Sequence, residues 1–286
     1  MPLRATQSSP SSGAQEYRFA SLDELASGCV ALPAEAAIAL SYNGIAHSVM
    51  MATPVDLEDF AVGFSLSNGL IEVAEELYDL TVRGTGERWE AELEVSSRAF
   101  WRLKRQRRTL AGTSGCGLCG VEALGQALPD LQPLSPSPLP SAAALAGLRV
   151  RIARMQRLGR RSGAVHAALF ADNRGDLLLC REDIGRHNAL DKLIGALARR
   201  VPSAEDGFAV LTSRCSLELV HKVVRAGIGT LVCLSAPSST SVIWARRHSL
   251  NLIHLPRREP PRVYSPEPSM RPPSGGKMDA SDALSN

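Results

Sequence analysis

The strongest constraint on the fold is a regular alternation of strand-like and helix-like segments between residues 165 and 255. Short apolar runs predict strands, and apolar residues spaced three or four apart predict helices. The predicted strands are 165–171, 176–181, 208–212, 230–235 and 252–255. The predicted helices between them are 188–198, 217–226 and 242–249. This alternation is typical of α/β proteins, in which helices pack on the faces of a mixed sheet.

The part of the chain before this region predicts a smaller, strand-rich unit. Asn43-Gly44 separates two strand-like runs, 37–42 and 45–51, and this dipeptide is the strongest short signal for a β-hairpin. Strict alternation over 89–95 predicts a half-buried strand. One helix is expected to begin after Asp56, which we predict to be its N-cap.

These patterns divide the chain into four parts. A proline-rich segment, 129–140, predicts a stiff linker or surface excursion, and Leu145, Leu148, Ile152 and Met155 predict one face of a helix after it. We expect a disordered arm over 1–16, a strand-rich N-terminal domain over 17–110, an α/β domain over 111–267 and a disordered tail over 268–286.

Composition places the chain among globular proteins of a reducing compartment. Its 286 residues, 44% of them apolar, suffice for a sizeable core. The net charge of +3 is too small to indicate nucleic acid as a partner. Six unevenly spaced cysteines do not predict a disulfide scaffold. The N-terminal residues lack the apolar stretch of a secretory signal, so we expect a cytoplasmic protein.

One uncharged run, residues 226–245, has the length of a membrane span. Pro237 and a cluster of hydroxyl side chains stand at its centre. We therefore predict a buried strand, a turn and the start of a helix there, and no contact with a membrane.

The most reactive pattern in the sequence is a single Cys-x-x-Cys, formed by Cys116 and Cys119. Four glycines surround the two thiols, the basic segment 98–108 precedes them, and residues 121–128 predict a short helix after them. Nearby cations and a helix N-terminus both favour the thiolate, which is the nucleophilic form of cysteine. Glycines allow another molecule to approach closely.

Three interpretations of this motif remain open from the residues alone. A structural zinc site normally needs four ligands, and no second cysteine pair at that spacing occurs. A dithiol redox centre is the second interpretation. A nucleophilic, sulfur-handling cysteine on a glycine-rich loop is the third.

Polar residues also gather where three predicted strands end and helices begin. In open α/β sheets, ligands bind at this edge, and free N–H groups at helix starts suit anions. Ordinary N-capping explains each turn equally well when it is considered alone. Together the three turns suggest a large anionic ligand, and the candidate residues are Glu182, Asp183, Arg186, His187, Asn188, Ser213, Arg214, Ser235 and Ser238.

Four of these stretches together resemble the FdhD/NarQ family, the formate dehydrogenase accessory sulfurtransferases. They are Thr-Ser-Gly-Cys-Gly-Leu-Cys-Gly at 113–120, Arg-Glu-Asp-Ile-Gly-Arg-His-Asn-Ala-Leu-Asp-Lys at 181–192, Thr-Ser-Arg-Cys-Ser-Leu-Glu-Leu-Val at 212–220 and Ser-Ala-Pro-Ser-Ser at 235–239. The second stretch is long and specific. The resemblance covers about residues 34–266.

The resemblance implies a cytidine-deaminase-like fold, a homodimer and a sulfur-transfer reaction. Cys116 would accept persulfide sulfur from a cysteine desulfurase, with Cys119 as its companion. The sulfur would pass to the molybdenum cofactor, as bis-molybdopterin guanine dinucleotide, before its insertion into the formate dehydrogenase catalytic subunit. The sequence contains no His-x-Glu, so zinc-dependent deamination is not supported. The alternative is a cofactor-binding chaperone or dithiol redox protein without sulfur transfer.

The resemblance also assigns a cofactor-contacting segment near the C-terminus. Its members here are Leu255, Pro256, Arg257, Arg258, Glu259 and Pro260. Basic residues are retained in this segment, whereas the glycines usual in the family are absent. For the guanine end of the cofactor, we expect Glu182 and Asp183 to accept hydrogen bonds from the base.

Overall fold

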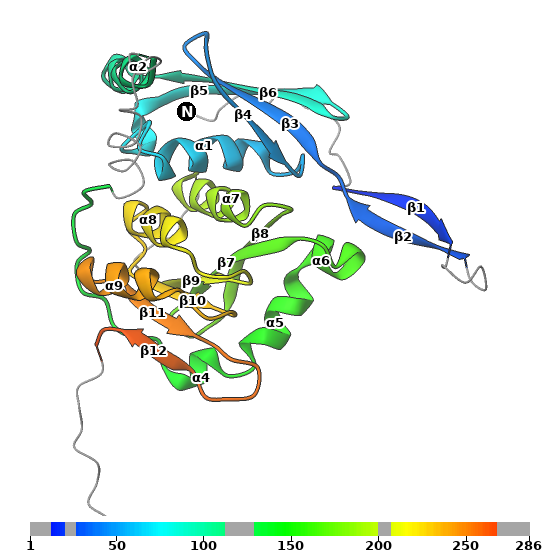
Figure 1. The fold of residues 1–286 in the computed structure, drawn as a ribbon, viewed down its shortest axis with the longest axis vertical. Helices are drawn as coiled ribbons and strands as arrows, with labels where there is room; N and C mark the ends of the chain where they lie inside the picture. Colours follow the sequence, from blue (N-terminus) through cyan, green and yellow to red (C-terminus); the bar gives the residue numbers. More distant parts are fainter. Residues whose placement is uncertain (1–12, 21–26, 112–128, 200–206, 268–286) are drawn as a thin grey trace, which may run out of the picture.

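A computed structural model of the chain describes residues 13–20, 27–111, 129–199 and 207–267 (Figure 1). Three sheets occur in these ranges: a two-stranded ribbon, a four-stranded sheet and a six-stranded sheet. The four-stranded sheet and its helices precede residue 112, and the six-stranded sheet follows residue 165. The predicted combination of a mixed α/β sheet and a smaller strand-rich unit is confirmed.

The four-stranded sheet is built around the predicted hairpin. Strands β3 (Ala36–Tyr42) and β4 (Ile45–Ala52) are antiparallel and are joined by Asn43 and Gly44, both at positive φ. The other two strands, β5 (Leu77–Thr85) and β6 (Arg88–Val95), complete the order β4-β3-β6-β5. A single 3-10 turn, η1 (Ala74–Glu76), leads into β5.

Helix α1 (Leu57–Ser67) covers one face of this sheet, and α2 (Ser97–Ala111) follows its last central strand (Figure 1). The phenylalanines Phe60 and Phe64 of α1 pack against alternate residues of β3 and β6, because side chains on a strand alternate between faces. Asp56 occupies the N-cap position as predicted, but its side chain accepts no capping hydrogen bond. Its backbone is left-handed, with φ of 52°.

The six-stranded sheet has the order β12-β11-β10-β9-β7-β8. Its strands are β7 (His166–Asp172), β8 (Leu177–Asp183), β9 (Gly207–Leu211), β10 (Thr230–Cys233), β11 (Asn251–His254) and β12 (Arg262–Ser265). Strands β9, β10 and β11 are mutually parallel, and β7 is antiparallel to both β8 and β9. Consequently, β8 runs in the same direction as β9, β10 and β11.

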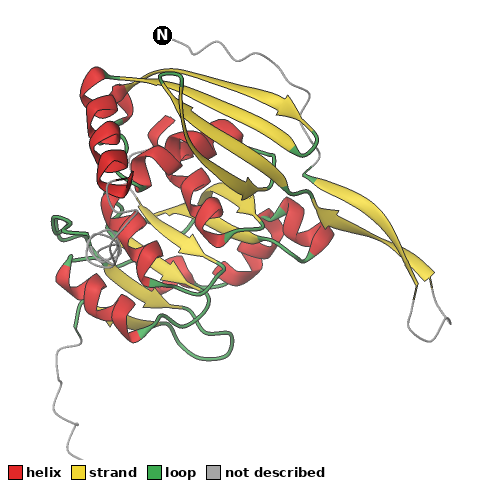
Figure 2. Ribbon diagram, turned by 45° about the horizontal axis from the view of Figure 1, so that its top comes forward, coloured by secondary structure: helices red, strands yellow, loops and turns green. Residues whose placement is uncertain are grey.

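Helices cover both faces of this sheet (Figures 1 and 2). One face carries α7 (Arg186–Arg199), α8 (Leu217–Arg225) and α9 (Ser239–Arg247). The other carries α4 (Ala142–Leu145), α5 (Leu148–Met155) and α6 (Arg157–Ser162). Successive residues of the central strands enter opposite cores: Ala209 and Leu211 face α7 and α8, whereas Phe208 and Val210 face α4 and α5. The two cores are therefore separated only by the sheet.

The two units meet where α1 lies across α7, and this is the most extensive contact between helices in the described ranges. Gly63 and Gly195 face each other at the crossing. A Cβ atom on Gly63 would lie 1.7 Å from the carbonyl oxygen of Asp191, and one on Gly195 would lie 1.8 Å from that of Asp59. The absence of side chains at both positions allows the two backbones to touch.

Several features differ from the sequence-based expectation. A ribbon of β1 (Ala14–Ala20) and β2 (Ser27–Pro33) projects from the body, so residues 14–16 of the expected disordered arm belong to a strand (Figure 2). The single helix expected around residues 145–155 is divided, because Gly147 adopts a positive φ of 65° between α4 and α5. Strand β12 was not predicted.

The remaining predictions for this region concern the linker and the membrane. Residues 129–140 form no helix or strand, yet Leu131 and Leu134 pack on the core under α8 and α9. The run 226–245 contains β10 and the first part of α9, as predicted. Within the described ranges, no helix combines the length and the apolar character that crossing a bilayer requires.

Replacing Gly63 or Gly195 by alanine should destabilise the protein. Alanine is favoured over glycine in a helix by about 1 kcal/mol, so helix propensity alone predicts a gain. The close backbone contact opposes it, because forcing a methyl group into a packed interface costs typically about 1–3 kcal/mol. Urea unfolding should therefore show a net loss of stability for either variant. A gain of stability would show that the two helices can separate without cost.

Candidate functional site

The three polar turns lie at one edge of the six-stranded sheet. Strands β8, β9, β10 and β11 point the same way, so their last residues, Asp183, Leu211, Cys233 and His254, share that edge. The turns after β9 and β10 are joined by a parallel bridge between Cys215 and Pro237. This is the edge at which ligands bind in open α/β sheets.

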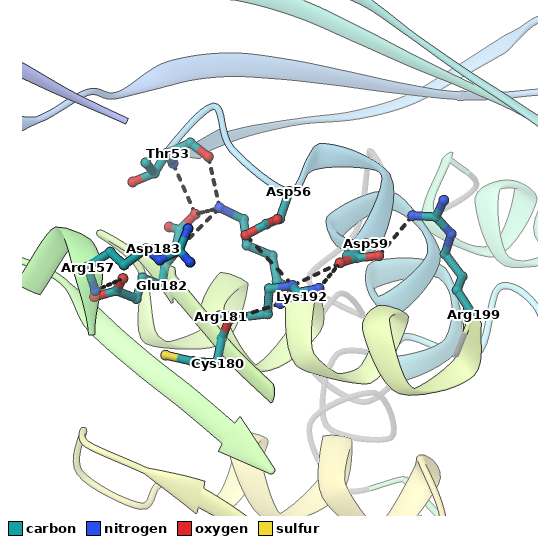
Figure 3. A network of polar contacts seen from close by, with 10 residues as sticks. All are labelled: Thr53, Asp56, Asp59, Arg157, Cys180, Arg181, Glu182, Asp183, Lys192 and Arg199. Carbon is teal, nitrogen blue, oxygen red and sulfur yellow. Dashed lines mark hydrogen bonds and ion pairs between the residues drawn. The ribbon is translucent and has the colours of Figure 1, made fainter. Parts of the chain in front are cut away.

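Asp183 is completely buried within this edge (Figure 3). Its carboxylate accepts hydrogen bonds from the backbone N–H of Thr53 at 3.0 Å and of Gly185 at 2.8 Å. It also accepts one from the Asn188 amide at 3.0 Å and lies 2.7 Å from the Lys192 ammonium. The carboxylate is therefore held entirely by partners within the chain.

Glu182 is buried beside it and faces the other side of the sheet. Its carboxylate accepts hydrogen bonds from the backbone N–H groups of Arg157, Leu158 and Gly159, at 2.8, 2.9 and 2.8 Å. These are donors of the first turn of α6 that would otherwise lack partners. In this conformation Glu182 holds the start of α6 and Asp183 joins the two units through Thr53, so neither offers a free carboxylate to a guanine base.

Lys192 is the cation that balances Asp183, and sequence reasoning did not select it. Its ammonium is fully buried and also donates to the carbonyl oxygens of Thr53 at 2.8 Å and Glu182 at 3.3 Å. A buried charge requires a charged partner and further hydrogen bonds, and Lys192 has both. Its presence in the same twelve-residue stretch as Asp183 was the available signal.

Two further carboxylates where α1 packs on α7 are paired in the same way, and Figure 3 shows the first of them, Asp59. Asp59 of α1 accepts from the Arg181 guanidinium at 2.8 and 2.6 Å and from Arg199 at 2.8 Å. Asp191 of α7 accepts from the Lys222 ammonium at 2.7 Å and from the Ser67 hydroxyl at 2.6 Å. The contacts of Asp59, and that of Asp191 with Ser67, join residues more than a hundred positions apart, so sequence patterns could not identify them.

The other candidate residues of the edge are more accessible. Arg186 and His187 are half-buried at the start of α7, and Arg214 is exposed after β9. Burial, followed by the charge of Arg186, lowers the pKa of both His166 and His187. His187 lies 3.1 Å from the Glu218 carboxylate. The edge therefore presents a positive surface next to neutral imidazoles.

The serines of the edge have local roles. The Ser238 hydroxyl accepts from the Ser241 N–H at 3.2 Å and caps α9, so the capping interpretation is confirmed there. Ser213 is buried, and its hydroxyl donates to the Arg214 carbonyl at 3.1 Å. Ser235 is half-buried in the turn after β10.

The segment 255–260 leaves the same edge directly after β11. Leu255 is buried, whereas Arg257, Arg258 and Glu259 are exposed. The Arg149 guanidinium of α5 donates to the carbonyl oxygens of Leu255 and Leu234, and so ties this segment to the turn after β10. The candidate residues of both turns and of this segment are thus brought together along one edge.

Cys116, Cys119 and the predicted helix 121–128 lie outside the described residues. The basic segment 98–108 belongs to α2. Among the residues that the structure does describe, no three His, Cys, Asp or Glu side chains gather as a metal site would require.

Comparison with known proteins identifies the family. The model of the FdhD/NarQ family matches residues 33–271. A "Sulfur carrier protein FdhD" from Variovorax paradoxus is 46% identical over 231 residues, which cover 81% of this chain and 83% of the relative. Proteins of the same name from Bordetella petrii and Xanthomonas euvesicatoria are 41% and 44% identical, with the same shares covered. The chain therefore belongs to the FdhD/NarQ family.

A solved structure supports the fold independently. It is a crystal structure from Desulfotalea psychrophila of a protein assigned as a formate dehydrogenase accessory protein. The two chains superpose with a TM-score of 0.68 at 24% sequence identity. The match covers 88% of this chain and 95% of the other, so both units of the fold are shared.

The buried pair of Asp183 and Lys192 yields a stability prediction. Lys192→Met leaves Asp183 charged and without its cation, and removing one partner of a buried pair costs about 3–5 kcal/mol. Arg83→Met is the matched control, because its pair with Glu92 is exposed and such pairs contribute about 0–1 kcal/mol. Chemical denaturation of both variants measures the difference. Equal losses in the two would contradict the structural role assigned to Lys192.

Proposed function

We propose that this chain is a sulfur carrier that serves the maturation of formate dehydrogenase. The observation that carries the proposal is the Cys-x-x-Cys of Cys116 and Cys119, enclosed by four glycines, in a chain of the FdhD/NarQ family. Relatives that share 40–46% of their residues with it are named sulfur carrier proteins. In the sequence, the basic segment 98–108 precedes the two cysteines, and cations near a cysteine favour its ionised form.

The proposed reaction is a persulfide exchange at Cys116. The Cys116 thiolate attacks the terminal sulfur of a persulfide on a cysteine desulfurase. The S–S bond of that persulfide breaks, the desulfurase cysteine leaves as a thiolate, and Cys116 becomes the persulfide. The sulfur then passes to molybdenum cofactor, the cargo, before the cofactor enters the catalytic subunit of formate dehydrogenase. Free thiols throughout this cycle require a reducing compartment, which supports a cytoplasmic location.

For the cargo, we propose the strand-end edge of the six-stranded sheet as the nucleotide-binding surface. Arg186 and Arg214 supply positive charge and N–H donors for phosphates, His187 supplies a further N–H donor, and Arg257 and Arg258 extend the positive surface along the segment after β11. Glu182 and Asp183 contribute by holding the turn in place, since their oxygens are occupied. A bis-guanine dinucleotide has two nucleotide ends, and a two-fold homodimer would offer one such edge to each.

The first prediction from this proposal concerns Cys116. Cys116→Ser should abolish activation of formate dehydrogenase, because a serine hydroxyl does not form a persulfide. Incubation with a desulfurase and cysteine should add the mass of one sulfur atom to the wild-type protein and none to the variant. Full activation by Cys116→Ser would leave a cofactor-delivering chaperone or dithiol redox protein as the function.

The second prediction concerns the nucleotide edge. GDP should bind with about one site per chain in calorimetry, and Arg214→Ser should weaken it about tenfold, the effect expected for loss of a hydrogen bond between charged groups. Arg246→Ser is the control, since Arg246 is also an exposed arginine but donates to Tyr264 and Glu267 near β12. Comparing the affinity for ADP with that for GDP tests whether the edge selects guanine over adenine. Equal effects of the two substitutions, or no binding of GDP, would remove the assignment of this edge.

A further inference from the structure

A second concave site lies at the seam between the two units, beside the free edge of β8 and away from the helix starts of α7, α8 and α9. It is a pocket of about 620 Å³, within the range of small-molecule sites. Residues from three places meet around it: the turn before α1, the outer strand β8, and the end of α5 with α6. The lining residues are Val55, Asp56, Met155, Arg157, Leu158, Arg161, Leu178, Leu179, Cys180, Arg181 and Glu182.

Some cations around this pocket have a carboxylate partner, whereas two arginines have none. Four cations along the contact between the two units, Lys192, Arg181, Arg199 and Lys222, each pair with a carboxylate of the chain. Arg157 and Arg161 lie one turn apart on α6, and neither guanidinium has an ion pair or hydrogen bond with any residue in the described ranges. Glu182, a carboxylate of the lining, accepts hydrogen bonds from three backbone N–H groups and forms no ion pair with either arginine.

The remaining carboxylate of the pocket does not neutralise these two arginines. Asp56 lies 3.7 Å from Arg181, which also donates to Asp59. Two adjacent guanidinium groups on one helix face repel each other, and a carboxylate or phosphate bound between them would relieve the repulsion through charge-assisted hydrogen bonds. The two unpaired arginines of the lining therefore favour an anionic ligand.

The apolar residues of the lining favour a ligand whose anionic group is attached to an apolar group. Val55, Met155, Leu158, Leu178 and Leu179 supply an apolar part of the lining, and Leu178 keeps 43% of its surface exposed. The Cys180 thiol completes it, and burial raises the pKa of this thiol to about 12. Cys180 therefore remains a neutral thiol and adds no negative charge against an anionic ligand.

We propose that this pocket binds a small organic anion, in which a carboxylate, phosphate or sulfonate contacts Arg157 and Arg161 and an apolar or aromatic body packs against the leucines. Because Val55 and Asp56 belong to the first unit and the other lining residues to the second, the ligand contacts both units. Its binding stabilises their docking. This site goes beyond the proposed sulfur-carrier function and uses none of its residues except Glu182, which is occupied internally.

The test uses anilinonaphthalene sulfonate, a fluorescent aromatic anion, and phenylnaphthylamine, which has the same ring system without the sulfonate. The sulfonate should bind the full-length protein with one saturable site and raise its unfolding temperature. The neutral compound should bind at least tenfold more weakly. The double substitution Arg157→Ser with Arg161→Ser should weaken the sulfonate about tenfold or more, the effect of losing hydrogen bonds between charged groups. Thermal unfolding without ligand should be nearly unchanged, since these guanidinium groups form no ion pair or hydrogen bond with a described residue.

Two control variants test whether the probe binds in this pocket. Arg160→Ser changes the same charge on the same helix at a residue outside the pocket, where the guanidinium donates to the Gln156 carbonyl, and it should leave affinity unchanged. Arg214→Ser alters only the nucleotide edge. Equal affinities for the anionic and neutral probes, an effect of Arg160→Ser as large as that of the double variant, or displacement of the probe by GDP would each overturn the proposal. None of these outcomes depends on whether Cys116 carries sulfur.

Discussion

The close crossing of α1 and α7 is the constraint on which the rest of the structure depends. Two glycines allow the helix backbones to touch, and this brings Asp59 of α1 within reach of Arg199 of α7 and of Arg181 in β8. In the same contact, Ser67 of α1 donates to Asp191 of α7. Wider spacing would leave the Asp59 carboxylate without these cations, and a buried charge without a partner is more costly than an apolar interface. The close packing of α1 on α7 and the pairing of the charges beside it therefore depend on each other.

The seam also explains the most distinctive stretch of the sequence. In the stretch 181–192, five acidic or basic side chains are buried and others remain at the surface. This mixture arises because the stretch passes from an outer strand through a turn into a helix. Thr53 forms three hydrogen bonds with this stretch. Its N–H donates to Asp183, its hydroxyl accepts from the Ile184 N–H, and its carbonyl accepts from Lys192. A residue of the first unit thus fixes the shape of the edge at which the second unit presents Arg186 and His187.

Sequence reasoning identified the strands, the helices and the edge, but it misjudged what the carboxylates do there. Periodicity and the Asn-Gly turn are local signals, and the hairpin of β3 and β4 and the alternation after residue 165 agree with the structure. Glu182 and Asp183 look like ligand-binding residues when only their neighbours are known. Their partners, the start of α6 and Thr53, lie 23 or more positions away along the chain. No local pattern contains that information, and the same limitation hid Asp59, whose cations lie 122 and 140 positions away.

The contacts of Thr53 also bear on whether the two units could exist separately. The α/β unit looks like a self-contained module, with its own sheet and helices on both faces. Without the first unit, however, the Lys192 ammonium would lose the Thr53 carbonyl, the Asp183 carboxylate would lose an N–H donor, and the bare glycine face of α7 would be open to water. The two units consequently form a single cooperative body, and exchange of either one between relatives would require its partner surface to be transferred with it.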